Sequence, residues 1–479
     1  MTTVTVTDSH RAGLHAASGV GTAPPPQPES LTPRPASWPG ELAIALAAGS
    51  LVVATGLWMA GGGLPALGTA PLTSLGRLTG LLAADLLLIQ VLLMARIPWV
   101  ERSFGQDLLG RRHRTAGFTS FWLMITHILL IILGDATADG GGALEEAWQL
   151  ITTAPGMLLA AAGTAALVAV VMLSIRAARR RLRYESWHLI HLYAYLGVAL
   201  ALPHQLWNGS ELTSSPVARI YWCSLYLLTL GAVLVYRLGL PAWRTLYHRL
   251  RVAAVVIEAP GVVSVYLTGH NLHRLPARAG QFFNWRFLDG PGWSRAHPYS
   301  LSAAPRPDWL RITIKDVDGS GRLARLCPGT RVLIEGPYGA LTSAHRQRPQ
   351  VLLAAAGIGI TPLRALLDEL TAAPRQITLL YRVSSRAQAV FARELEAIAA
   401  DGGVRLCYLE GPRATGNPAW LPAHLASVGG AEVLRRLVPD VGQHDVYLCG
   451  PVPWTEALSA SLASAGVPAP QLHTEHFTW

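Results

Sequence analysis

The segment HRTAGFTSFWLMITH, residues 113–127, begins and ends with a histidine and carries no charge from Thr115 to Thr126. An α-helix rises about 1.5 Å per residue, so the two imidazoles stand about 21 Å apart, after nearly four whole turns. They therefore face the same side of one helix. Because the hydrocarbon core of a membrane is about 30 Å thick, each histidine is expected near a different membrane surface.

Apolar segments of about 20 residues recur through the first half of the chain, and this is the length that crosses the hydrocarbon core as a helix. Of the 479 residues, 51% are hydrophobic and only 14% are charged, which also indicates a protein that lies partly in lipid. The pattern predicts six membrane helices. They lie at residues 41–60, 76–95, 115–134, 155–175, 187–207 and 217–237.

The net charge of +10 includes arginines that cluster in the loops between these segments. The clusters at residues 96–114 and 176–183 follow the second and fourth segments, which is typical of cytoplasmic membrane loops and not of a surface that binds nucleic acid. The sequence therefore predicts a multi-pass protein of the cell (plasma) membrane with both termini in the cytoplasm. Residues 1–39, rich in Pro, Thr and Ser, are predicted to form a disordered cytoplasmic tail.

The fifth predicted helix carries three further histidines and runs in the same direction as the third. His113 can then meet His191 at the cytoplasmic end, and His127 can meet His204 at the outer end. Facing histidines on two helices suit the axial ligation of haem iron. A single histidine in a bundle is more often a structural polar group, but two matched pairs predict two haems held at different depths in the membrane.

The choice of inner ligand on the fifth helix stays open, because His188 lies one turn before His191 and is its rival. The thirteen-residue step from His191 to His204 does not return to the same face of an ideal helix. We expect Pro203 to distort the helix there, since its ring clashes with the carbonyl of Ala199.

The periodicity changes at about residue 251. Segments 252–258, 262–268 and 310–316 alternate or are β-branched, as in the strands of an antiparallel barrel. Beyond residue 349, strand-like segments alternate with helical ones, which predicts a parallel α/β sheet. These later strands are expected at 351–356, 377–383 and 445–450.

The expected architecture is therefore a multi-domain membrane protein with a six-helix haem bundle, an antiparallel β-barrel and an α/β nucleotide-binding domain with a parallel sheet. The tail, the membrane domain, the barrel and the nucleotide domain are predicted at residues 1–39, 40–240, 247–345 and 346–479, respectively.

A flavin site is indicated by His297-Pro298-Tyr299-Ser300, because an aromatic ring can pack on the isoalloxazine while a neighbouring hydroxyl bonds its reactive edge. Alone, this segment is also consistent with a structural loop. Residues 336–339, Gly-Pro-Tyr-Gly, are expected to close the barrel as a turn. Residues 318–321, Asp-Gly-Ser-Gly, with Ser320 at their centre, can cradle a pyrophosphate at the start of a helix.

A nucleotide site is indicated by AAAGIGITPLRALL, residues 354–367. The strand runs into Gly357-Ile358-Gly359, with Thr361 expected as the helix N-cap and Pro362 at the first helical position. Glycines let the backbone approach a phosphate, and the helix N-terminus favours its charge.

Two further strand ends complete this site. At the first, Arg382, Ser385 and Arg386 would suit a 2′-phosphate, which favours NADPH over NADH. The second strand ends at Cys449-Gly450-Pro451, where ligands bind in α/β sheets. The alternative for Cys449 is a small buried hydrophobic residue.

In combination, these motifs resemble the ferric reductase and NADPH oxidase superfamily over residues 40–479. The membrane part is similar to the ferric reductase-like transmembrane domain, and the soluble part to the ferredoxin–NADP reductase-type module. The resemblance implies FAD, NADPH as the hydride donor (with NADH possible), and two b-type haems. The haem ligands it implies are His113 with His191 and His127 with His204.

The resemblance also implies roles for single residues. The catalytic set is Ser300, Cys449, Glu475 and Phe477. The FAD set is His297, Pro298, Tyr299, Ser300, Lys315, Ser320, Phe477 and Trp479. The NADPH set is Gly357, Ile358, Gly359, Thr361, Pro362, Arg382, Ser385, Arg386, Cys449, Gly450 and Pro451. The family ends with Glu-x-aromatic, as at Glu475-His476-Phe477, but this chain continues to Trp479, so either aromatic can cover the flavin.

The activity expected from this resemblance is transfer of electrons from NADPH, across the bilayer, to ferric iron or a similar one-electron acceptor. An oxidase that reduces oxygen is the close alternative, although Ile131 lies where the family's oxidases usually place another histidine. A haem-binding redox sensor, or an electron donor to a partner protein, is the second alternative. Complete flavin and nucleotide motifs disfavour it, because a sensor needs no hydride donor.

Overall fold

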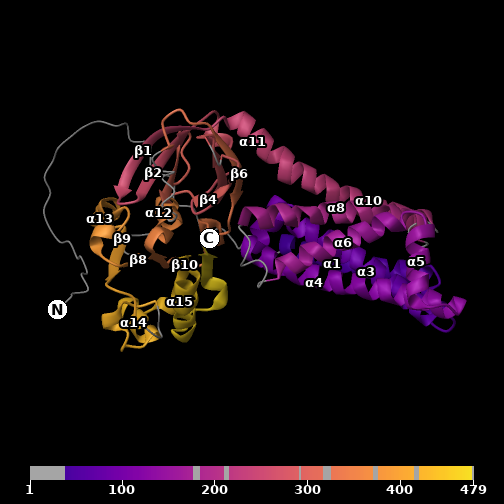
Figure 1. The fold of residues 1–479 in the computed structure, drawn as a ribbon. Coiled ribbons are helices and arrows are strands. Elements are labelled where there is room, and N and C mark those ends of the chain that lie inside the picture. Colours follow the sequence, from indigo (N-terminus) through magenta and orange to yellow (C-terminus); the bar gives the residue numbers. More distant parts are fainter. Residues whose placement is uncertain are drawn as a thin grey trace. The chain divides into compact units, whose positions relative to one another are not determined.

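The computed structural model describes residues 38–175, 184–209, 215–290, 293–316, 325–370, 376–414 and 420–476. It contains two compact units, each described here by itself (Figure 1). The helical unit comprises Glu41–Ile97 and Asp107–Arg237. The remaining described residues, mainly those from Leu238 onward, form the second unit, which we call the sheet unit.

Within the described residues, six helices are long and apolar enough to cross a membrane, and they match the six predicted segments. The elements concerned are α1 (Trp38–Ala60), α3 (Pro71–Leu93), α4 (Pro98–Asp139), α6 (Met157–Ser174), α8 (Tyr184–Asn208) and α10 (Pro216–Ala232). The last span continues through a π-helical turn, η1 (Val233–Gly239), into α11 (Leu240–His248).

Residues 134–154, between the third and fourth predicted segments, are largely helical, because α4 continues to Asp139 and a further helix, α5, occupies Ala143–Thr153. Helix α8 runs through Pro203 without a break, so the expected distortion at this proline does not end the helix.

Helices α6 and α8 pack backbone against backbone. A Cβ atom added to Gly163 would lie 2.7 Å from the carbonyl oxygen of Gly197, so neither position has room for a larger side chain. Small residues at helix contacts are how membrane bundles achieve close packing, because lipid supplies no hydrophobic force between helices.

The first part of the sheet unit consists of two three-stranded antiparallel sheets, with orders β1-β2-β5 and β4-β3-β6. The strands are β1 (Arg251–Ala259), β2 (Val262–Thr268), β3 (Phe282–Phe287), β4 (His297–Ser300), β5 (Leu310–Lys315) and β6 (Val332–Tyr338). The antiparallel pairing was predicted. Two local expectations were wrong, since the flavin motif is a strand and not a loop, and residues 336–338 end β6 and do not form a turn.

These two sheets are linked by isolated bridges. Leu301 pairs with Ile312, and Arg251 pairs with Arg331. In the described residues, continuous strand pairing closes neither junction, so a closed barrel stays a prediction.

The second part of the sheet unit is a parallel five-stranded sheet of order β11-β10-β7-β8-β9. Its strands are β7 (Val351–Ala356), β8 (Ile377–Val383), β9 (Val404–Glu410), β10 (Asp445–Gly450) and β11 (Leu472–His476). Strands β7, β8 and β10 were predicted, whereas β9 and β11 were missed.

Helices cover both faces of this parallel sheet (Figure 1). Leu353 of β7 packs in one core with α12 (Ile360–Glu369) and α13 (Ala392–Ala400). Leu352 packs in the other core with α14 (Gly430–Leu437) and α15 (Val452–Ser464). Neighbouring strand residues point to opposite faces, which explains why β7 is apolar throughout.

Candidate functional site

The histidines predicted to pair at the inner level are neighbours. The imidazole rings of His113 on α4 and His191 on α8 have centroids 6.1 Å apart, with planes inclined at 68°. His191 also stacks on Trp187 at 5.1 Å. His188 is in contact with Trp187 at 6.4 Å. This geometry favours His191 over His188 as the partner of His113.

Two backbone carbonyl groups of α3 fix which ring nitrogen carries the proton in the two α4 histidines. Nδ1 of His113 lies 3.0 Å from the carbonyl oxygen of Gln90, and Nδ1 of His127 lies 2.7 Å from that of Gly76. A carbonyl can only accept, so Nδ1 donates in both bonds and Nε2 keeps its lone pair in the neutral ring. Such bonds orient imidazoles that bind metals.

The contact of His127 with α3 depends on Gly80, a residue that was not predicted to belong to the site. A Cβ atom on Gly80 would lie 2.6 Å from Nδ1 of His127. With Gly76 one turn earlier, the segment reads Gly-x-x-x-Gly, a spacing typical of close helix packing in membranes. From this spacing, the surface of α3 that contacts His127 could have been predicted.

His204 belongs to the outer level. A Cβ atom on Gly156 would lie 3.0 Å from the backbone nitrogen of His204, so the start of α6 packs directly on this part of α8.

A pocket in the sheet unit brings the predicted flavin and nucleotide motifs together. It is lined by Pro298, Tyr299, Ser300, Thr313, Lys315, Ile358 and Thr361. Ser300 is 2% exposed, and its hydroxyl has no hydrogen-bond partner among the described residues. A buried hydroxyl without a partner costs free energy unless a ligand satisfies it.

Strand pairing fixes the orientation of residues 297–300 in β4. Ser300 lies opposite Phe282 in the β3–β4 register, and the Trp285 indole donates to the carbonyl of Tyr299 at 2.9 Å. The rings of His297 and Tyr299 stack at 5.8 Å. The backbone of the flavin motif is therefore held from one side, which leaves Ser300 directed at the pocket.

The glycine loop has a different boundary from the one expected. Gly357–Gly359 forms a 3₁₀ turn, and α12 begins at Ile360 with Gly359 as its N-cap. Thr361 and Pro362 therefore lie inside the first turn, and the Thr361 hydroxyl donates to the carbonyl of Ile358 at 3.0 Å. The predicted N-cap and first helical residue were each placed two residues too late.

Gly359 is required by close packing. A Cβ atom there would lie 2.2 Å from the carbonyl oxygen of Cys449, so the glycine loop and the end of β10 touch through their backbones. Next to this contact, Gly450 packs on Trp454, and Pro451 is the N-cap of α15.

Cys449 and Glu475 are brought side by side. They are register partners on the parallel strands β10 and β11. Cys449 is fully buried, and its burial, with the neighbouring Glu475 carboxylate, raises the pKa of the thiol well above its ordinary value. The side chain is therefore a neutral thiol at physiological pH.

The two arginines proposed for the 2′-phosphate differ in their surroundings. The Arg382 side chain is buried and donates to backbone carbonyls, at 3.1 Å to Leu409 and 2.8 Å to Gly411. Arg386 follows Ser385, is partly exposed, pairs with Glu396 at 2.8 Å and lies 3.7 Å over the ring of Tyr408. Arg386 is the more available cation for a ligand.

Three predicted flavin residues, Ser320, Phe477 and Trp479, lie outside the described residues. Lys315 is exposed at the end of β5 and lines the pocket.

The fold and these sites define a class, a multi-pass membrane protein that carries a reductase-type FAD- and NAD(P)H-binding module. Residues 79–202 match the family model of the ferric reductase like transmembrane component. A flavohemoprotein of Chromobacterium violaceum is 31% identical to this chain over 260 residues, an alignment that covers 50% of this chain and 61% of that protein. These matches confirm the predicted resemblance in both halves.

Two other proteins match a similar share of the chain. The ferredoxin reductase component of the 3-ketosteroid-9-alpha-monooxygenase of Mycobacterium tuberculosis is 31% identical over 242 residues, which is 48% of this chain and 64% of that protein. The flavohem-like FAD/NAD-binding domain of nitric oxide dioxygenase from Vibrio cholerae matches with 24% identity and a TM-score of 0.40, over 48% of this chain and 98% of that one. The chain spans less than two thirds of the length of these curated relatives.

Proposed function

We propose that this chain is an NAD(P)H-dependent transmembrane oxidoreductase. It passes electrons from cytoplasmic NADPH, through FAD and two b-type haems, to an acceptor outside the cytoplasm, for which we propose ferric iron or a similar one-electron acceptor. The main support for this proposal is that the rings of His113 and His191 are neighbours. The same chain also has the pocket lined by Ser300 in the sheet unit.

The inner histidine pair fits haem. A centroid separation of 6.1 Å accommodates two metal–imidazole bonds of about 2.0 Å each, together with the two half-rings. Among the described residues, no group of three or more His, Cys, Asp or Glu side chains is placed to hold a metal. A metal here would take only two protein ligands, and haem meets that condition because the porphyrin supplies the rest.

His113 with His191, and His127 with His204, would hold the two haems. When bound, each haem would supply a one-electron carrier. The α3 carbonyls of Gln90 and Gly76 keep Nε2 of the α4 histidines available as ligand atoms.

The residues that line the pocket in the sheet unit have the chemistry that suits the ring of a flavin, an aromatic side chain next to a buried hydroxyl without a partner. When bound there, FAD would accept a hydride from the nicotinamide and release the electrons singly. The hydroxyl of Ser300 would donate to the reactive edge, and Tyr299 would pack against the ring. Cys449, held neutral next to Glu475, would line the nicotinamide side without placing a second negative charge there. Arg386 would bind the 2′-phosphate of NADPH.

We place the protein in the plasma membrane with both termini and the sheet unit in the cytoplasm. The arginine-rich loops after the second and fourth membrane helices support this orientation.

Oxygen reduction is the second candidate function. Against it, Ile131 packs tightly on α3, since a Cβ atom on Gly76 would lie 2.9 Å from its Cδ1. The site one turn after His127 is therefore filled by an apolar side chain.

The test is steady-state turnover of the purified, haem- and FAD-loaded protein with NADPH, with reduction of a ferric chelate and consumption of oxygen measured side by side. We expect many turnovers with the ferric chelate and far fewer with oxygen. Reduction that stops after one equivalent per chain would instead support a sensor and refute the enzyme.

A further inference from the structure

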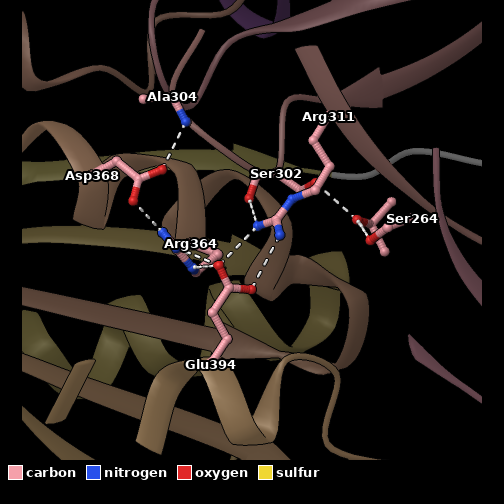
Figure 2. Close-up of polar contacts among 8 residues, drawn as sticks. Ser264, Ser302, Ala304, Arg311, Arg364, Asp368 and Glu394 are labelled. Atoms are coloured by element: carbon pink, nitrogen blue, oxygen red, sulfur yellow. Dashed lines mark hydrogen bonds and ion pairs between the residues drawn. The ribbon is translucent and has the colours of Figure 1, made fainter. Parts of the chain in front are cut away.

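A charged cluster joins the two parts of the sheet unit at a place that the proposed mechanism does not use. Glu394 on α13 accepts from both Arg311 on β5, at 3.2 Å, and Nε of Arg364 on α12, at 2.8 Å (Figure 2). Arg364 also donates to Asp368 at 2.7 Å. We call these four residues the Glu394 bridge.

The bridge is balanced in charge and mostly buried. Its two guanidinium groups belong to residues that are only 5% and 7% exposed, and they face two carboxylates. Arg311 approaches both oxygens of Glu394, the paired geometry in which an arginine binds a carboxylate most strongly. Because both arginines share Glu394, removing its charge would leave two neighbouring cations with less compensation.

The bridge also forms hydrogen bonds with the backbone of the segment that follows the flavin motif. Arg311 donates to the carbonyl of Ser302 at 2.6 Å, and the backbone nitrogen of Ala304 donates to Asp368 at 3.0 Å (Figure 2). Ser302 and Ala304 come two and four residues after Ser300. The position of the segment carrying Ser300 is therefore tied to α12.

Two of the three elements that carry the bridge, β5 and α12, also line the pocket. On β5, Arg311 shares one strand face with Thr313 and Lys315, which line the pocket. On α12, Arg364 follows the pocket residue Thr361 by three residues, an axial distance of about 4.5 Å along a rigid helix. Movement at the bridge would therefore be transmitted to both walls of the pocket.

We propose that the Glu394 bridge is a positioning device that fixes the distance between the glycine loop of residues 357–359 and Ser300, and thereby the distance over which hydride passes. This inference rests on the proposed function. None of the four residues lines the pocket, so they are positioning residues. Hydride transfer is sensitive to such spacing, since a displacement of about 1 Å can lower a rate about 100-fold.

The test compares Glu394→Gln with the wild type in the full-length protein loaded with FAD and haem. We expect equal FAD content and a similar Kd for NADP⁺, but a limiting rate of flavin reduction at saturating NADPH that is about 10- to 100-fold lower. Amide hydrogen exchange of residues 357–364 should become faster. Glu394→Asp, which keeps the charge, should recover part of the rate.

Glu432→Gln is the matched control, because it removes an exposed ion pair with Arg436 elsewhere in the same unit and should change none of these quantities. An unchanged limiting rate with unchanged exchange in Glu394→Gln would overturn the proposal. If that variant does not fold, Asp368→Asn, which weakens the hold on Ala304 and removes the ion pair with Arg364 but keeps Glu394, is judged by the same two measurements. If the wild type shows no flavin reduction by NADPH, the proposed function fails, and hydrogen exchange alone decides the role of the bridge.

Discussion

A methyl group on Gly80 would lie 2.6 Å from Nδ1 of His127, closer than any real contact of this kind. The absence of a side chain at this position of α3 is what lets the imidazole lie against the helix and donate to the carbonyl of Gly76 at 2.7 Å. The orientation of the proposed outer haem ligand is thus determined by a residue on a neighbouring helix.

Gly80→Ala should therefore displace His127 and lower the haem content, because overpacking a tight contact costs about 1–3 kcal/mol. Gly49→Ala on α1 is the control, since its Cβ would meet no atom within 4 Å. Pyridine haemochrome analysis gives the haem count for both variants. Full haem content with an unaltered spectrum in Gly80→Ala would show that His127 is not held in this way.

Two variants test directly whether His191 or His188 is the inner haem ligand. We expect His191→Leu to lose one haem of two, because its ring is the one that faces His113 at 6.1 Å. His188→Leu should keep both haems. The reverse result, measured by haem count and by the low-temperature spectrum of the reduced protein, would move the inner ligand to His188.

The sequence was sufficient to predict the six membrane helices and the strands β1, β2, β5, β7, β8 and β10, because a continuous apolar or alternating pattern encodes each of them. Strand β11 could not be found in this way, since LHTEH has no strand periodicity and forms by pairing with β10. Helix α5 is short and lies between two membrane segments, where an irregular loop is the more common structure.

The candidate site was predictable only in part. The inner pair, His113 with His191, was predicted from the positions of these histidines on two helices that run in the same direction, and their rings are neighbours. The contact of His127 with Gly76 and Gly80 depends on which face of α3 meets α4. The ion pair between Arg311 and Glu394 joins residues that are 83 positions apart in sequence. Contacts of this kind are set by tertiary packing and leave no local pattern.

Nucleotide preference should depend on Arg386. Loss of a charged hydrogen bond to a phosphate costs about 1.5–3 kcal/mol, so Arg386→Ala should lower kcat/KM for NADPH about 10- to 100-fold and leave the value for NADH nearly unchanged. Steady-state kinetics with both nucleotides provide the check. A variant that retains the full preference for NADPH would remove Arg386 from the 2′-phosphate site.

The pH response of Cys449 follows from its raised pKa, which burial and then Glu475 produce. The unfolded chain loses the thiol proton at about pH 8.5, whereas the folded chain keeps it. Stability from this group is therefore present below about pH 8.5 and is lost as the pH rises toward the folded pKa. The fall in Tm between pH 8 and pH 10 should be shallower in Cys449→Ala than in the wild type.

Alkylation gives an independent check of the same thiol. At pH 8.5 the exposed Cys327 should react with iodoacetamide, while Cys449 should stay unmodified until the protein unfolds. Equal rates at the two cysteines, measured by mass spectrometry, would contradict a buried neutral thiol.

The central claim is that electrons from NADPH cross the membrane within one chain. The most direct measurement uses sealed proteoliposomes with the haem- and FAD-loaded protein, NADPH added outside and a membrane-impermeant ferric chelate trapped inside. We predict reduction of the trapped chelate at a rate proportional to the number of outward-facing sheet units, and its loss in His127→Leu. Oxidation of NADPH without any reduction inside the vesicles would contradict the account.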